Sequence, residues 1–176
     1  CLFGEIVLTS SGTEAANLGI LGPALANTDP DRRRILMGAA EHHCVLHTRP
    51  LLERLGYTVE LLPVDRSARI LLDELDSRLN EGVLLVAAMH ANNEVGTIQD
   101  VVAIGEATHR VGARLFVDAV QTYLTSTAPV DVKALGADYL AVAAHKVYGP
   151  KGAGALFASA GAPLHPVLVG GGQGAA

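Results

Sequence analysis

The sequence predicts an α/β fold in which a mostly parallel β-sheet carries helices on both faces. Three observations lead to this prediction. Short apolar runs alternate with segments of helical length along the 176 residues, as they do in layered α/β domains. The apolar runs are continuous, which is typical of parallel strands buried on both faces. Hydrophobic residues form 49% of the chain but aromatic residues only 4%, so small aliphatic side chains would fill the core.

Seven strands and four helices are expected. The strands are predicted at residues 6–9, 34–38, 58–63, 84–90, 114–118, 139–143 and 153–158. The helices are predicted at residues 13–26, 44–55, 72–80 and 100–111. The fourth helix would begin at Asp100 and end at Gly112, where glycine can adopt the left-handed conformation. No helical segment separates the last two strands, so we expect them to pair antiparallel at one edge of the sheet.

Composition excludes several classes of protein. The chain has 13 basic and 18 acidic residues and a net charge of -5, which argues against a nucleic-acid-binding protein. Its longest apolar run, residues 83–89, is too short to span a bilayer. The two cysteines, Cys1 and Cys44, form no disulfide framework, which favours a cytoplasmic location. The chain starts without Met, so we expect one incomplete domain, residues 1–176, of a longer protein.

Polar side chains follow five of the predicted strands at the point where each strand ends. Because the carboxyl ends of parallel strands meet at one edge of a sheet, these side chains are expected to face a single cleft. A lysine in a partly desolvated site is suited to Schiff-base chemistry, and a carboxylate at the end of an apolar strand calls for a cationic partner. The residues concerned are Thr13, His42, Asn93, Asp118, Gln121, His145 and Lys146.

Each of these features also has a plainer interpretation. Thr13 can belong to an ordinary helix N-cap rather than to an anion site at a helix start. Asp118 can cap the next segment, and Lys146 can be a surface lysine in a turn. A metal-binding protein is a further alternative, because His43 and His47 are four residues apart and could share a helix face. Its ligands would come from the cluster His42, His43, Cys44 and His47. No second pair of ligands lies at a useful spacing, however.

Five motifs together resemble a known family. In this order, they resemble the NifS/IscS-like cysteine desulfurases and the related selenocysteine lyases, which are class-V aminotransferase proteins with the aspartate aminotransferase fold. The motifs are TSSGTEAAN at 9–17, EHH at 41–43, HANNEVG at 90–96, VDAVQ at 117–121 and HKVYGPKG at 145–152.

The resemblance implies a pyridoxal 5'-phosphate cofactor and a role for each residue around its ring. Lys146 would bind the cofactor covalently and later act as the base in proton transfer. Asp118 would pair with the pyridinium nitrogen and keep it protonated. Gln121 would donate a hydrogen bond to the ring phenolate, and Asn93 would lie beside that oxygen and the substrate. His42 would stack on the ring and assist proton transfer.

The phosphate side shows one departure from the family. Thr13 and His145 would hold the phosphate, with the helix start at Gly12 supplying backbone donors. The family often places Ser or Thr three residues before the lysine, where this chain has Ala143, so one phosphate contact is expected to be missing. The cysteine that forms the persulfide in this family lies well downstream of the lysine, and neither cysteine of this chain occupies its place.

The resemblance also implies the reaction of the whole protein. Residues 1–176 would be the cofactor-binding large domain, without the N-terminal segment and the small C-terminal domain. The complete enzyme would convert L-cysteine to L-alanine and leave sulfur as a persulfide, and this chain alone would catalyse partial chemistry at most. A homodimer, a sulfur-acceptor protein and iron–sulfur cluster assembly are implied, with neither nucleic acid nor membrane as partner. The alternatives are a selenocysteine lyase acting on L-selenocysteine, another lyase or aminotransferase of this fold, and a non-catalytic partner-binding module.

Overall fold

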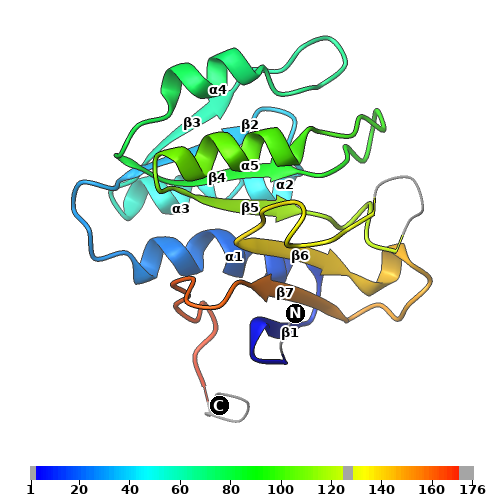
Figure 1. The fold of residues 1–176 in the computed structure, drawn as a ribbon. Coiled ribbons are helices and arrows are strands. Elements are labelled where there is room, and N and C mark those ends of the chain that lie inside the picture. Colours follow the sequence, from blue (N-terminus) through cyan, green and yellow to red (C-terminus); the bar gives the residue numbers. More distant parts are fainter. Residues whose placement is uncertain (1–2, 125–128, 171–176) are drawn as a thin grey trace.

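The structure, a computed structural model, describes residues 3–124 and 129–170. In these residues seven strands form one mixed sheet with helices on both faces (Figure 1). The spatial order of the strands is β1-β7-β6-β5-β4-β2-β3. The strands are β1 (Ile6–Thr9), β2 (Arg34–Gly38), β3 (Thr58–Leu62), β4 (Val83–Met89), β5 (Arg114–Asp118), β6 (Tyr139–Ala143) and β7 (Gly154–Ala158).

The helices cover the two faces of the sheet separately, and each face has its own buried cluster. Helices α4 (Leu72–Arg78) and α5 (Val101–Arg110) pack on one face. Helices α1 (Gly12–Ala26), α2 (His43–Leu46) and α3 (Arg49–Arg54) pack on the other. Two short 3-10 helices, η1 (Phe3–Glu5) and η2 (Ala144–Lys146), complete the described elements. The central strands β2, β4, β5 and β6 are therefore buried on both sides, as their continuous apolar runs predict.

The antiparallel pairing of the last two strands is confirmed, but their predicted place in the sheet was wrong. β7 pairs antiparallel with β6 and also antiparallel with β1. The edge of the sheet is therefore β1, and β7 lies inside it. Because β7 alone is reversed, β1 runs in the same direction as the other five strands. The carboxyl ends of these six strands consequently share one edge.

The predicted helix at residues 44–55 is two helices in the structure. α2 ends at Leu46 and α3 begins at Arg49. Pro50 lies in the first turn of α3, and in a continuous helix its ring would collide with the carbonyl of Leu46. Between the two helices, the hydroxyl of Thr48 donates a hydrogen bond to the carbonyl of Val45 at 2.7 Å. This break leaves α2 as a single turn, whose N-cap His42 and whose second residue Cys44 line the pocket described below.

The remaining boundaries agree with the predictions to within two residues. Asp100 is the N-cap of α5, where its side chain accepts a hydrogen bond from the backbone N–H of Ala103 at 3.1 Å. Gly112 follows the helix with φ of +69°, the left-handed conformation expected of it. In residues 3–124 and 129–170, no helix combines the length and hydropathy needed to cross a membrane. Cys1 lies outside the described residues.

Candidate active site

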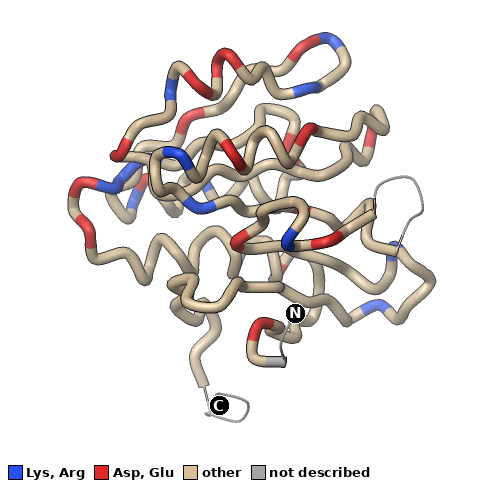
Figure 2. The backbone as a smooth tube through the Cα atoms, viewed as in Figure 1, with Lys and Arg blue, Asp and Glu red and all other residues tan. Residues whose placement is uncertain are grey.

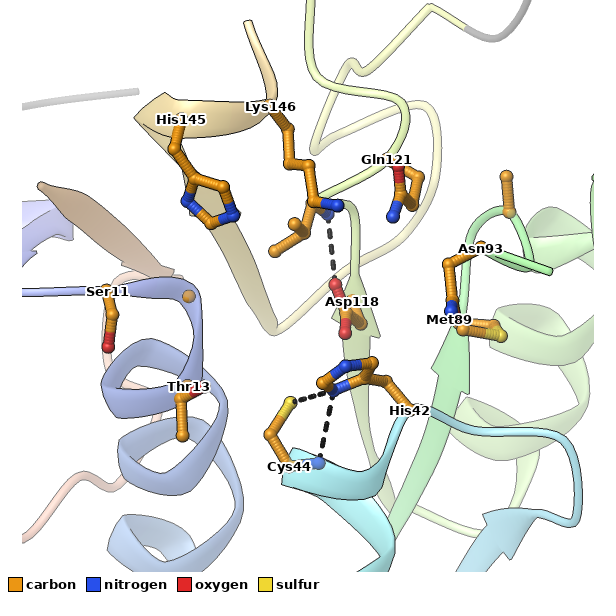
Figure 3. A pocket seen from close by; sticks show the side chains of 13 residues that line it. Ser11, Thr13, His42, Cys44, Met89, Asn93, Asp118, Gln121, His145 and Lys146 are labelled. Atoms are coloured by element: carbon orange, nitrogen blue, oxygen red, sulfur yellow. Dashed lines mark hydrogen bonds between the residues drawn. The ribbon is translucent and has the colours of Figure 1, made fainter. Parts of the chain in front are cut away.

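One pocket of about 200 Å³ lies at the carboxyl ends of the strands, and it contains every site residue that the sequence predicts. The loops after β1, β2, β4, β5 and β6 each contribute to it, which confirms that these five loops face one cleft. Figure 3 shows that the side chains of the loops point toward a common centre. The lining residues are Ser11, Gly12, Thr13, His42, Cys44, Met89, Ala91, Asn93, Asp118, Val120, Gln121, His145 and Lys146.

The start of α1 combines the two interpretations that the sequence left open. Ser11 is the N-cap and accepts from the backbone N–H of Glu14 at 3.1 Å. The Glu14 carboxylate in turn accepts from the hydroxyl of Ser10 at 2.5 Å and from its backbone N–H at 2.7 Å, and these two hydrogen bonds lower the pKa of Glu14. Gly12 and Thr13 nevertheless line the pocket. The first turn of a helix has backbone N–H groups without partners inside the helix, so an anion can bind here.

Gly12 is required at this helix start by close packing. A Cβ at this position would lie 2.9 Å from Cγ2 of Val120 and 3.1 Å from the Cβ of Ala143. These contacts join the start of α1 to the loop after β5 and to the end of β6. Ala143 is fully buried, and its Cβ lies beside the start of α1 at Gly12.

Asp118 is a buried carboxylate at the last residue of β5. Its side chain accepts from the backbone N–H of Val120 at 3.0 Å. Burial raises the pKa of Asp118, while the Val120 hydrogen bond and the nearby His42 act in the opposite direction. A cation in the pocket would favour the charged form of this carboxylate further.

His42 is held by the first turn of α2. Its Nδ1 accepts from the backbone N–H of Cys44 at 3.1 Å and lies 3.0 Å from Sγ of Cys44. A ring nitrogen that accepts a hydrogen bond carries no proton, so the proton of neutral His42 lies on Nε2. Burial, together with the carboxyl groups of Asp118 and Glu41, raises the pKa of the Cys44 thiol to about 12. Cys44 is therefore a thiol, not a thiolate, in this site.

Lys146 and His145 lie in η2, directly after β6, and both side chains are exposed. In Figure 3 the side chain of Lys146 extends into the pocket above Asp118, with Gln121 beside it. Asn93 lies across the pocket from His145 and comes from the loop after β4. The predicted residues are thus brought together from loops that are up to 134 positions apart in the chain.

Sequence reasoning missed one buried residue beside the site and several lining residues. Glu41 stands directly before His42, and it is only 6% exposed. The signal for it was present in the sequence, since an acidic residue next to a predicted site histidine follows an apolar strand. The lining residues without a predicted role are Ser11, Cys44, Met89, Ala91 and Val120.

The alternative metal site finds no support in the described part of the chain. The rings of His43 and His47 stack with centroids 5.0 Å apart, whereas His42 is turned into the pocket. No group of three or more His, Cys, Asp or Glu side chains in residues 3–124 and 129–170 is arranged to hold a metal ion.

Comparison of the sequence with known proteins identifies related chains. The family model of the class-V aminotransferases matches residues 3–175. A cysteine desulfurase IscS from Dictyoglomus turgidum is 41% identical over 96% of this chain and 42% of its own length. A putative cysteine desulfurase IscS 1 from Bacillus subtilis is 44% identical over 96% of this chain and 44% of its own length. This chain therefore spans less than half the length of these two relatives.

Solved structures agree with the sequence comparison. A NifS-like protein superposes with a TM-score of 0.90 and 37% identity, over 97% of this chain and 46% of that one. The structure of SspA in complex with cysteine gives a TM-score of 0.88 and 33% identity, over 98% of this chain and 50% of that one. The fold is thus of the aspartate aminotransferase type, as the sequence predicts. With the family model matching nearly every residue, the chain belongs to the class-V aminotransferase family.

Proposed function

We propose that this chain is the cofactor-binding large domain of a pyridoxal-phosphate-dependent cysteine desulfurase. The whole protein would convert L-cysteine to L-alanine and transfer the sulfur, as a persulfide, to an enzyme cysteine outside this chain. The observation that carries the proposal is the convergence of Lys146, Asp118 and His42 in one pocket. The names of the relatives from Dictyoglomus turgidum and Bacillus subtilis supply the substrate.

The pocket fits the chemistry of pyridoxal 5'-phosphate at both ends. The helix start at Gly12 and Thr13 offers backbone donors for a phosphate group, and a Cβ at Gly12 would collide with its neighbours. At the other end, the buried carboxylate of Asp118 is suited to a protonated ring nitrogen, because a buried anion is stabilised by an adjacent cation. A flat aromatic ring between these ends would lie beside His42.

The cofactor, when bound, withdraws electrons from the substrate and so stabilises a carbanion at its Cα. Lys146 would hold the cofactor through its aldehyde. Once the substrate amine has displaced it, the freed amine of Lys146 would accept the Cα proton and later return it. Because Nδ1 of His42 accepts the N–H of Cys44, only Nε2 of His42 is available to move a proton. Asn93 and Gln121 would orient the substrate and the ring oxygen through their amide groups.

The proposal has further parts, some of which concern the whole protein and some the phosphate side of the pocket. The proposal includes a homodimer in the cytoplasm, a sulfur-acceptor protein and a place in iron–sulfur cluster assembly. Thr13 and His145 would hold the cofactor phosphate, and Ala143 would leave one phosphate contact unmade. The high pKa of the Cys44 thiol supports a sulfur-accepting cysteine elsewhere, because a thiolate is the nucleophile in persulfide chemistry.

The first experiment is a visible absorption spectrum of the full-length protein after addition of pyridoxal phosphate. Borohydride reduction and peptide mapping would then locate the covalent adduct. We expect the adduct on Lys146, its loss in Lys146→Ala, and its retention in the control Lys151→Ala, which removes an exposed lysine five residues away.

Substrate assays separate the remaining alternatives. L-Cysteine should give L-alanine and enzyme-bound sulfur, faster than L-selenocysteine gives L-alanine. An adduct with preference for L-selenocysteine would instead identify a selenocysteine lyase. A folded protein without any adduct on Lys146 would contradict the proposal and favour a non-catalytic module.

A further inference from the structure

Glu41 is a buried carboxyl group that the proposed chemistry does not use. It is 6% exposed, and its Oε2 is buried without a hydrogen-bond partner in the described residues. Its Oε1 accepts from the backbone N–H of Met89 at 2.6 Å. A buried carboxyl is costly unless its contacts compensate, so its place beside the site calls for an explanation.

The carboxyl of Glu41 replaces a missing backbone acceptor at the end of the sheet. β2 and β4 pair in parallel, and their last paired residues are Met37 and Ala87. β4 continues to Met89, whose N–H faces the side on which β2 has already ended. The Glu41 side chain reaches back to that N–H and satisfies it, as buried backbone donors require.

The Glu41 carboxyl fits closely against the end of β2. A Cβ on Gly38 would lie 2.8 Å from Oε1 of Glu41, so the last residue of β2 makes space for this side chain. A second hydrogen bond holds the same loop, because Nδ2 of Asn92 donates to the carbonyl of Ala40 at 2.9 Å. The loop of residues 39–42 is therefore fastened to the end of β4 by two side chains.

His42 is the last residue of this loop and the N-cap of α2. We propose that Glu41 is a positioning residue that acts through His42: by binding the N–H of Met89, it fixes the loop that holds the imidazole over the pocket. The inference rests on the proposed function, in which His42 moves a proton at Nε2. Desolvation raises the pKa of Glu41 well above its usual value.

A double-mutant cycle in the full-length protein tests this role. We expect His42→Ala to lower kcat for alanine formation about 100-fold or more. Glu41→Ala should lower it about 10-fold to 100-fold, the cost of a displaced catalytic group. In the His42→Ala background, Glu41→Ala should have little further effect, because residues that act as a unit are not additive. Glu41→Gln should recover most of the loss, since its amide oxygen can still accept from Met89.

A second readout does not need the cofactor. The ¹⁵N resonances of the His42 ring in the cofactor-free protein report whether Nδ1 still accepts a hydrogen bond. We expect Glu41→Ala to shift them, and Glu41→Gln and the exposed control Glu106→Ala to leave them in place. If circular dichroism shows that Glu41→Ala does not fold, Asn92→Ala takes its place in both experiments. This substitution removes the second hydrogen bond to the loop, from Asn92 to the carbonyl of Ala40.

Two results would overturn the inference. One is an equal loss of kcat from Glu41→Ala with and without His42, which would make the role merely structural. The other is an unchanged His42 spectrum in folded Glu41→Ala. Failure of the proposed function would give a different result, namely the absence of an adduct on Lys146 in the wild-type protein. The ¹⁵N spectra of the His42 ring would still decide the role of Glu41 in that case.

Discussion

Replacing Glu41 with glutamine should make the stability of the protein less dependent on pH. Burial raises the pKa of Glu41, Asp118 adds to the increase, and the Met89 hydrogen bond opposes it. The folded protein thus holds this proton more tightly than the unfolded chain does. The stability that neutral Glu41 contributes is fully present below its ordinary pKa of 4.5, and it is lost as the pH rises toward the raised value.

The size of the effect follows from proton linkage. Glutamine does not titrate, so the unfolding free energy of Glu41→Gln relative to wild type should grow with pH. Within the window above pH 4.5, the expected gain is about 1.4 kcal/mol for each pH unit, which corresponds to one proton. Any part of the difference in unfolding free energy between Glu41→Gln and wild type that does not depend on pH leaves this slope unchanged.

Urea unfolding followed by circular dichroism at pH 5, 6 and 7 would measure the slope in both cofactor-free proteins. Glu106→Gln, an exposed position on α5, serves as the control and should show no such slope. Asp118 and Cys44 both interact with Glu41. Asp118 also has a raised pKa, but it titrates in both proteins and largely cancels in the difference. A pH-independent difference would show that folded Glu41 is ionised, and would refute the reasoning.

Three further substitutions test the packing of the site and of the sheet. Gly12→Ala places a Cβ 2.9 Å from Val120 and should lower the unfolding free energy by about 1–3 kcal/mol; unchanged urea midpoints would contradict the close packing. Ala143→Ser adds a hydroxyl beside the start of α1 and should tighten pyridoxal phosphate binding about tenfold, as a hydrogen bond to a charged group allows. Equal or weaker binding in a spectroscopic titration would mean that this position does not reach the phosphate. Asp138→Ala removes the 2.7 Å ion pair with Arg114, the 2.8 Å contact with Nε2 of His109 and the acceptor for the Leu115 N–H at 2.8 Å. It should lower the unfolding free energy by about 3 kcal/mol, measured by thermal or urea unfolding; a loss below about 1 kcal/mol would show that solvent replaces these contacts.

Charge is distributed unevenly over the fold. Figure 2 shows acidic and basic residues mainly around β2, β3, α4 and α5, while α1 is largely uncharged. α1 carries Glu14 as its one charged residue. The half of the fold that contains α1 and β1 therefore presents few charges to its surroundings.

The local pattern of the sequence determined the elements and the edge at which the site lies. Runs such as residues 83–89 are apolar throughout because both faces of the sheet are covered there, and this pattern is visible without any tertiary information. The same pattern placed Asp118 and Lys146 at strand ends, and right-handed parallel connections bring such ends to one edge. The break before Pro50 was also present in the sequence, since proline excludes a continuous helix there.

Only the tertiary structure decided which groups touch. That β1 is the edge strand depends on long-range pairing with β7, and local sequence does not encode the order of strands. The partner of Glu41 is a backbone N–H 48 positions away, left open because β2 ends before β4. The tautomer of His42 likewise depends on a helix start that holds its Nδ1. Such contacts arise from the meeting of separate chain segments, and residue type and spacing alone do not specify them.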